Sequence, residues 1–180
     1  MSDAAVPEDL PPSWIWLLLA LAVLALDQAS KWLIAHDLPL GASMPITGFF
    51  NLVHVENPGA AFSFLAAEPG WQRWLFTGLG SAVSLLIAVV LLRRRQRVLM
   101  GLALGLILGG ALGNVADRVL WGHVTDFLDF YLRTASGAWH WPAFNLADSA
   151  ITVGAVALLL DEQRQSRRRQ RSTAGDAGRG

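Results

Sequence analysis

The sequence contains no cysteine, which excludes disulfide bonds, thiolate metal sites and cysteine nucleophiles. Charge is also scarce, because Asp, Glu, Lys and Arg make up only 16% of the 180 residues. The four histidines are isolated and lack the spacing of a metal-ligand set, and no serine lies in a Gly-x-Ser-x-Gly turn. No phosphate-binding loop or dinucleotide-binding glycine pattern is present. We therefore expect neither a metal nor a cofactor.

Apolar residues dominate the remainder of the composition, at 53% of the chain, and eight residues are Trp. This composition is typical of an integral membrane protein. Four apolar runs, at about 14–34, 74–92, 98–120 and 144–160, approach or exceed the roughly 20 residues that cross a bilayer, although the fourth is short. The sequence predicts an all-α polytopic membrane protein, with four transmembrane helices in a single domain that spans residues 14–160.

The two ends of the chain differ in charge from this domain. Residues 1–13 are acidic and contain proline, and residues 161–180 are basic, so both are predicted to be disordered tails. Arginines cluster in 93–97 and again in 164–171, whereas the 35–70 loop has no Lys or Arg. The positive-inside rule places the arginine clusters and both termini in the cytoplasm. Because the clusters adjoin the spans, we interpret them as topology signals and expect no nucleic-acid partner.

Two local patterns predict structure within this topology. The segment from Met44 to Val55 is rich in β-branched and aromatic residues and is bounded by turn-forming residues, which favours one or two short strands on the outer side. Glycines recur every fourth residue along the third span, at positions 101, 105, 109 and 113. Such a stripe of small residues indicates close packing between helices.

Acidic residues converge at the outer surface in this topology. Asp27 lies in the outer half of the first span, Asp117 near the outer end of the third, and Asp148 about one turn into the fourth. Asp126 and Asp129 lie in the loop between the last two spans. A carboxyl group at membrane depth is energetically costly and by default indicates a functional site.

Two neighbouring carboxyl groups do not both ionise easily, so one keeps a proton while the other stays charged. This arrangement can activate water and protonate a leaving amide nitrogen, as in aspartic peptidases. The candidates are Asp117, Asp126, Asp129 and Asp148. Asp27 precedes Lys31 by one helical turn, which favours a structural ion pair, whereas no cation lies near Asp148 within its span. Spacing alone does not select the partner of Asp148.

Two other classes of protein also fit an apolar chain with buried acids. A proton-coupled transporter would need polar groups along a path across the bilayer, but the inner halves of all four spans lack acidic or basic residues. A non-enzymatic membrane adaptor would explain the helices and the glycine stripe. It would not explain several acids grouped near one surface.

Five short motifs occur in order between about Asp27 and Val156, and together they resemble the lipoprotein signal peptidase (signal peptidase II) family. Each motif alone is weak, but the ordered set is specific. The motifs are Asp27-Gln28-Ala-Ser-Lys31, Glu56-Asn57-Pro-Gly59-Ala60-Ala61-Phe62, Gly109-Gly110-Ala-Leu-Gly113-Asn114-Val-Ala-Asp117-Arg118, Val124-Thr-Asp126-Phe127 and Phe144-Asn145-Leu-Ala147-Asp148.

The resemblance implies an aspartic endopeptidase of the bacterial inner membrane, with its active site near the periplasmic face. Its partners would be membrane lipid and prolipoproteins, cut before a diacylglyceryl-modified cysteine, and it would act as a monomer. A small extracytoplasmic β-cradle, at about 44–64 here, and a short interfacial helix would accompany the four spans. By similarity the catalytic pair is Asp126 and Asp148. The implied substrate-binding or supporting residues are Asn57, Gly59, Asn114, Asp117, Arg118, Asn145, Ala147, Asp27 and Lys31.

Overall fold

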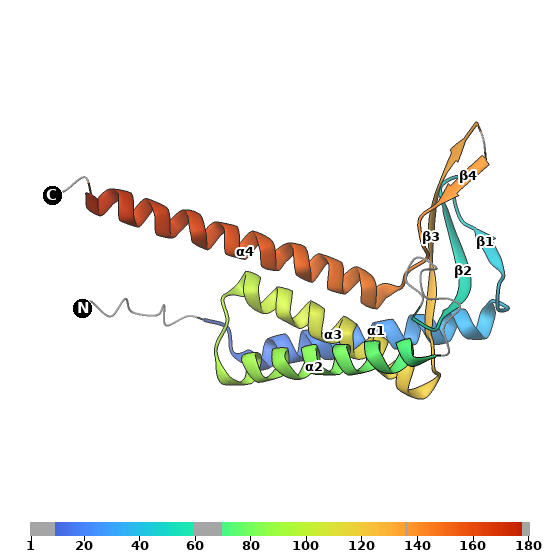
Figure 1. Cartoon of the computed structure of the whole chain (residues 1–180), viewed down its shortest axis with the longest axis horizontal. Helices are drawn as coiled ribbons and strands as arrows, with labels where there is room; N and C mark the ends of the chain where they lie inside the picture. The colour runs from blue at the N-terminus through green and yellow to red at the C-terminus, as the bar shows by residue number, and fades with distance from the viewer. Residues whose placement is uncertain (1–9, 60–69, 136, 178–180) are drawn as a thin grey trace.

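The computed structural model describes residues 10–59, 70–135 and 137–177. Within these ranges the chain forms four helices and a four-stranded sheet (Figure 1). The helices run alongside one another, and the sheet lies across the end where α1 finishes and α4 begins (Figure 1). Their bounds are α1 Ser13–Asp37, α2 Trp71–Arg93, α3 Val98–Leu120 and α4 Leu146–Ala177.

Helix α3 is the centre of the bundle and packs against each of the other three helices. Its glycine stripe faces α1: a Cβ atom added at Gly101 would overlap the ring of Trp16, and one at Gly109 would lie 2.5 Å from the carbonyl oxygen of Ala20. Next to the stripe, a Cβ at Gly110 would lie 2.5 Å from the carbonyl oxygen of Ala147 in α4. Glycine thus allows α1 and α4 to approach the backbone of α3 closely.

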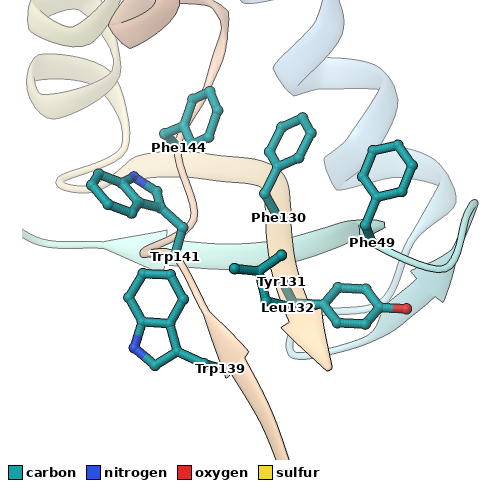
Figure 2. Close-up of a pocket in the computed structure, with 7 residues that line it drawn as sticks. All are labelled: Phe49, Phe130, Tyr131, Leu132, Trp139, Trp141 and Phe144. Carbon is teal, nitrogen blue, oxygen red and sulfur yellow. The ribbon is translucent and has the colours of Figure 1, made fainter. Parts of the chain in front are cut away.

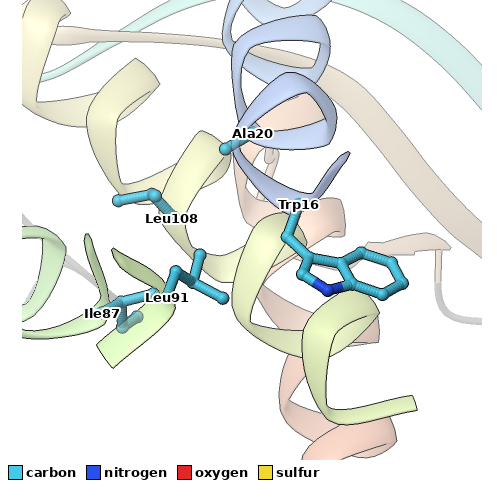
Figure 3. Packing of buried hydrophobic residues seen from close by; sticks show 5 residues of the cluster. All are labelled: Trp16, Ala20, Ile87, Leu91 and Leu108. Carbon is cyan, nitrogen blue, oxygen red and sulfur yellow. The ribbon is translucent and has the colours of Figure 1, made fainter. Parts of the chain in front are cut away.

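The buried apolar cluster lies on the side of the bundle away from the sheet. Trp16 and Ala20 of α1 pack there with Ile87 and Leu91 of α2 and Leu108 of α3 (Figure 3). Leu91 has no exposed surface at all. This cluster holds together the three helices that are long and apolar enough to cross a membrane.

Those three helices are α1, α2 and α3, as judged by length and composition over the described residues. Their outer surfaces carry large exposed apolar side chains, such as Leu18 and Leu26 on α1 and Leu85 and Leu86 on α2. Water would oppose so large an apolar exterior, whereas lipid accommodates it. The predicted third span, 98–120, coincides with α3, and α2 begins three residues before the predicted start at 74.

Helix α4 departs from the sequence prediction at both ends. It begins at Leu146 rather than 144, and it continues to Ala177 through residues predicted to form a disordered tail. The polar residues that follow Leu160 form the final helical turns. Among them, buried Asp161 lies 3.7 Å from Arg97, which belongs to the connection between α2 and α3. The transmembrane character of α4 stays a prediction, because its polar residues exclude it from the set of clearly apolar helices.

The all-α classification is not confirmed, whereas the small sheet predicted beside the helices is present: four antiparallel strands pair in the order β1-β2-β3-β4. Their bounds are β1 Ser43–Pro45, β2 Phe50–Asn57, β3 Val124–Thr134 and β4 Gly137–His140. The first two fall in the predicted cradle at 44–64, except that β1 begins one residue earlier, at Ser43. The cradle residues from 60 onward, with the Ala60-Ala61-Phe62 motif, fall outside the described residues. Helices α1 to α4 are the only ones in the described part of the chain, so the interfacial helix stays a prediction.

Strands β3 and β4 come from the 121–143 loop, for which the sequence predicted no strand. Alternation is present in β3, but Asp126 and Asp129 are both buried and obscure it in the sequence. Pairing with β2 is interrupted by a bulge between Leu52 and Val55, so that Val55 lies opposite Asp126. A bulge of this kind redirects side chains locally.

The close contact of α1 with α3 gives a testable expectation. Replacing Gly109 with alanine places a Cβ atom against the backbone of Ala20, so we expect a loss of about 1–3 kcal/mol in stability. Gly78→Ala is the matched control, because Gly78 is also helical and a Cβ there meets nothing within 4 Å. Thermal unfolding in detergent measures both variants. Equal melting temperatures would contradict the packing described here.

Candidate active site

A buried ion-pair network joins α1 to α3 at the sheet end of the bundle. The Lys31 ammonium lies 2.7 Å from a carboxylate oxygen of Asp27 and 2.6 Å from one of Asp117. Gln28 donates a second hydrogen bond to Asp117 at 2.7 Å. Asp27 and Lys31 therefore form the ion pair that their spacing of one helical turn predicts. Of the two cations available to Asp117, Lys31 is its partner rather than Arg118.

The network continues into α4 through the backbone. The other carboxylate oxygen of Asp27 accepts a hydrogen bond of 2.8 Å from the amide N–H of Ala147, which is fully buried. Lys31 also donates to the side-chain oxygen of Asn114, at 3.0 Å. Asn114 in turn donates to Asp148 at 2.8 Å. Polar side chains therefore fix the relative positions of α1, α3 and α4.

Asn145 and Asp148 form a capping box at the start of α4. The Asn145 side-chain oxygen accepts a hydrogen bond of 2.9 Å from the amide N–H of Asp148, and a longer bond of 3.4 Å runs from the Asn145 N–H to the Asp148 carboxylate. Such reciprocal bonds satisfy amide groups that the first turn leaves free. The spacing of three residues between Asn145 and Asp148 is thus that of a helix start.

Asp126 of β3 meets this helix start from the sheet side. One of its carboxylate oxygens accepts a hydrogen bond of 2.7 Å from the side-chain amide of Asn145, and the other accepts one of 3.0 Å from Asn57. Only 3% of Asp126 is exposed. Asn145 therefore contacts both Asp126 and Asp148, and Asn114 contributes the second amide beside Asp148.

Asn57 is held in place by the turn that follows β2. Its side-chain oxygen accepts a hydrogen bond of 2.9 Å from the amide N–H of Gly59, which leaves its amide group to face Asp126. Gly59 has a φ of +115°, and a Cβ atom there would lie 3.1 Å from the ring of Phe76. Both the backbone conformation and the close contact require glycine at this position.

The environment of Asp126 favours its protonated form. The pKa of Asp126 is raised to about 6, chiefly by burial; the hydrogen bonds from Asn57 and Asn145 and the charge of Lys31 partly offset the rise, and the nearby charge of Asp148 adds to it. Asn145 links the two residues, because its side chain donates to Asp126 and its backbone N–H lies 3.4 Å from the Asp148 carboxylate. They are the two that the sequence resemblance selects.

Asp129, the fourth candidate acid, lies in a separate cluster. It accepts a hydrogen bond of 2.7 Å from Asn51 of β2, and it lies 2.8 Å from the Nδ1 atom of His140 in β4. Three positions separate it from Asp126 in one strand, so the two side chains point to opposite faces of the sheet. It therefore ties three strands together and does not join the site around Asn145.

Arg118 lies at the edge of the site. It is half-buried, donates a hydrogen bond of 3.2 Å to the carbonyl oxygen of Asn114, and stacks over the ring of Phe76 at 5.5 Å. Its charge interacts with Asp117, Asp126 and Asp148. Within the described residues no carboxylate pairs directly with Arg118.

Sequence reasoning missed Arg73 of α2. Its guanidinium donates hydrogen bonds of 2.7 and 3.2 Å to the carbonyl oxygens of Arg118 and Val119, which end α3. A basic side chain at such a helix terminus satisfies free carbonyl groups and complements the helix dipole. No spacing rule signals this contact, because it joins positions on two different helices.

Comparison with known proteins identifies the origin of this arrangement. The sequence model described as signal peptidase (SPase) II matches residues 19–164. The chain belongs to the signal peptidase II family. The resemblance stated from the five motifs is confirmed.

Curated relatives of this signal peptidase II family member cover most of its length. The lipoprotein signal peptidase of Cupriavidus necator is 57% identical over 154 residues, which are 86% of this chain and 86% of that protein. That of Burkholderia vietnamiensis is 57% identical over 152 residues, or 84% and 89% of the two chains. The chain is therefore a peptidase, and its three apolar helices agree with a membrane enzyme.

Two solved structures, each described as a bacterial membrane enzyme studied by the in meso method, share the fold. One has a TM-score of 0.71 at 29% identity and covers 84% of this chain and 89% of its own. The other has a TM-score of 0.68 at 30% identity and covers 82% and 91%. The arrangement of helices and sheet in this signal peptidase II member is thus shared with known membrane enzymes.

The Lys31 network leads to a stability prediction. Lys31→Met leaves Asp27 and Asp117 buried without their cation, so we expect a loss of about 3–5 kcal/mol. Adding Asp27→Asn and Asp117→Asn removes the buried negative charge and should restore part of that loss. Thermal unfolding in detergent compares the three proteins. If the triple variant is no more stable than Lys31→Met, unpaired charge is not the cause.

The raised pKa of Asp126 leads to a pH prediction. Between its ordinary value of 3.8 and about 6, the folded protein holds a proton that the unfolded chain releases. Stability should therefore fall as pH rises through this window, by about 3 kcal/mol in total for a difference of this size. Asp126→Asn removes the titrating group and should remove this fall. Unfolding midpoints at about pH 4.5 and about pH 7 test this, and an unchanged pH dependence in the variant would refute it.

Proposed function

We propose that this protein is an aspartic endopeptidase that removes the signal peptide from prolipoproteins, with Asp126 and Asp148 as its catalytic pair. The observation that carries the proposal is the position of Asn145, whose side-chain amide donates to the Asp126 carboxylate and whose backbone N–H lies 3.4 Å from the Asp148 carboxylate. Asp117 and Asp27 are less suited to the role, because Lys31 lies between them. Asp129 is bound to Asn51 and His140 in a separate cluster.

The two carboxyl groups occupy unequal environments, which suits a division of labour. Asp126 is buried in the sheet, and its raised pKa favours a protonated carboxyl that can donate to the leaving amide nitrogen. Asp148 lies in the first turn of α4 and accepts a hydrogen bond of 2.8 Å from Asn114. We assign to Asp148 the removal of a proton from the attacking water.

The family relationship supports the substrate. The relatives are named lipoprotein signal peptidases, and we propose for this chain the same class of substrate, cut before a diacylglyceryl-modified cysteine. The bond to be cut then lies at the outer end of the substrate's own signal helix. An active site at the end of a membrane bundle meets it there and has access to water.

The topology follows from the distribution of arginine. The site lies at the sheet end of the bundle, whereas Arg93, Arg94 and Arg97 lie at the opposite end. The positive-inside rule assigns that opposite end to the cytoplasm of a bacterial inner membrane, so the site faces the periplasm. We infer that α4 is the fourth span, since it exposes Val153, Val156 and Leu159 away from the bundle.

Two further residues would support the reaction. Asn57 holds one oxygen of Asp126 from the end of β2, where it can also contact the substrate backbone. Arg118 carries a positive charge beside both acids and donates only to a backbone carbonyl among the described residues. We assign both to binding and orientation of the substrate rather than to proton transfer.

Cleavage of a lipidated prolipoprotein by the purified protein in detergent or liposomes tests the proposal. Asp126→Asn and Asp148→Asn should each reduce cleavage by at least about a hundredfold, as expected for loss of a group that transfers a proton. Asp129→Asn is the matched control, because it neutralises another buried acid in the same strand and should retain cleavage. An unlipidated substrate should not be cut.

The outcomes separate the parts of the proposal. If Asp126→Asn still cleaves the substrate and Asp117→Asn does not, Asp117 takes the place of Asp126 in the catalytic pair. The proposed enzyme class would then stand. Failure of the parent protein to cleave any lipidated substrate would overturn the proposed activity. Melting temperatures of all variants show whether a loss reflects unfolding.

A further inference from the structure

The β3–β4 hairpin has two chemically different faces. In its antiparallel register Leu132 lies opposite Trp139, whereas Tyr131 lies opposite His140 and Arg133 lies opposite Ala138. Residues directly opposite each other share a face, so Leu132 and Trp139 occupy one side of the hairpin and the polar residues occupy the other. The hairpin is therefore amphipathic.

The apolar face is large, exposed and hollow. Leu132, Trp139 and Trp141 are exposed by 64%, 54% and 54%. Together with neighbouring rings they line a hollow of about 390 Å³ (Figure 2). The lining is completed by Phe49, Phe130, Tyr131 and Phe144. A contiguous exposed apolar surface of this kind marks an interaction site.

The polar face is fastened to the sheet. His140 contacts buried Asp129 at 2.8 Å and stacks on Tyr131 at 5.2 Å, and Asp129 binds Asn51 of β2. Arg133 lies over the ring of Tyr131 at 5.8 Å. These contacts hold β4 in one orientation and direct the apolar face to the opposite side.

The position of the hairpin indicates what covers that face. In Figure 1 the hairpin rises across the sheet end of the bundle and projects past α4. The rings of Phe49, Phe130 and Phe144 point toward the helix ends in Figure 2. Helix α4 exposes Val153 and Val156, and the space beside the helices lies on the side toward which these rings point. In the proposed topology that space belongs to the outer leaflet of the bilayer.

We propose that the apolar face of the β3–β4 hairpin rests on the outer leaflet, with phospholipid acyl chains filling the hollow between its aromatic rings. The inference rests on the topology given in the proposed function. Trp and Tyr are favoured at this depth because their rings combine an apolar body with a polar group. The lipid surface is a better occupant than a water-borne partner, because the face points toward the membrane.

Contact with lipid at the hairpin would set the depth, relative to the membrane, of β3, the strand that carries Asp126. The Phe144 carbonyl oxygen accepts hydrogen bonds of 3.0 and 2.8 Å from the amide groups of Phe127 and Leu128, and the Phe144 N–H donates back to Leu128. Phe144 therefore links the lipid-facing surface to the segment of β3 that follows Asp126 and to Asn145. The hairpin positions the site relative to the membrane and takes no part in the chemistry.

The absence of cysteine permits a direct test with single labelled sites. Leu132→Cys and Arg133→Cys are adjacent in the chain but lie on opposite faces, and each can carry a nitroxide label in vesicles of phosphatidylethanolamine and phosphatidylglycerol. We expect the label at 132 to be more accessible to oxygen, which partitions into lipid, than to a water-soluble nickel complex. The label at 133 should show the reverse order.

Leu159→Cys on α4 separates this proposal from the topology on which it rests. If the label at 159 lies in lipid and the label at 132 is as exposed to water as that at 133, the proposal is overturned and the topology survives. If the label at 159 also lies in water, both fail. A label at 132 that becomes shielded only after a lipidated substrate is added would overturn lipid as the occupant in favour of the substrate chain.

A second measurement avoids any change at Leu132. Lipids with bromine on the acyl chain near the headgroup quench tryptophan fluorescence on contact. We expect Trp139→Phe with Trp141→Phe to lose a quenched component of the parent emission, and both changes preserve an aromatic ring. If the emission that these two residues contribute is not quenched in the parent protein, the proposal is wrong.

Discussion

The sheet end of this protein depends on one constraint: polar groups buried in an apolar bundle must be satisfied by one another. Lys31 lies between Asp27 and Asp117, Asp27 accepts the amide N–H of Ala147, and Asn114 links Lys31 to Asp148. Each of these groups would be costly alone at this depth, where water is scarce. Their mutual contacts therefore fix the register of α1, α3 and α4 and place the acids of the site.

The polar network depends on the close helix packing that the glycine stripe allows. Asp and Asn side chains are short, so helices must lie close together before these groups can reach a partner. A Cβ atom at Gly113 would lie 2.5 Å from a carboxylate oxygen of Asp27, and one at Gly110 would lie as near to the carbonyl oxygen of Ala147. Small residues on α3 thus bring α1 and α4 to the distance at which the network forms.

The sequence predicted those parts of the structure that depend on local patterns. Apolar runs located the three helices that are long and apolar enough to cross a membrane, and the pair of Asp27 with Lys31 followed from its spacing. Strand β3 escaped prediction because its partner Asn51 is remote in sequence from Asp129, and because buried acids masked its alternation. For the same reason, spacing could not separate Asp126 from Asp129, although a strand directs them to opposite faces. The contact of Arg73 with the end of α3 required the packed helices themselves.

The two acids of the proposed catalytic pair lie on different kinds of element, one on a helix and one on a strand. Asp148 is carried by the first turn of a helix, and Asp126 is carried by a strand that packs across the helix ends. Contacts of Asn145 and Phe144 with β3 hold the strand against the start of α4. A shift of the sheet relative to the bundle would therefore change the separation of the two carboxyl groups directly. Anchoring the far edge of the sheet on the lipid surface restricts that shift, and it aligns the pair with the depth at which a lipidated substrate arrives.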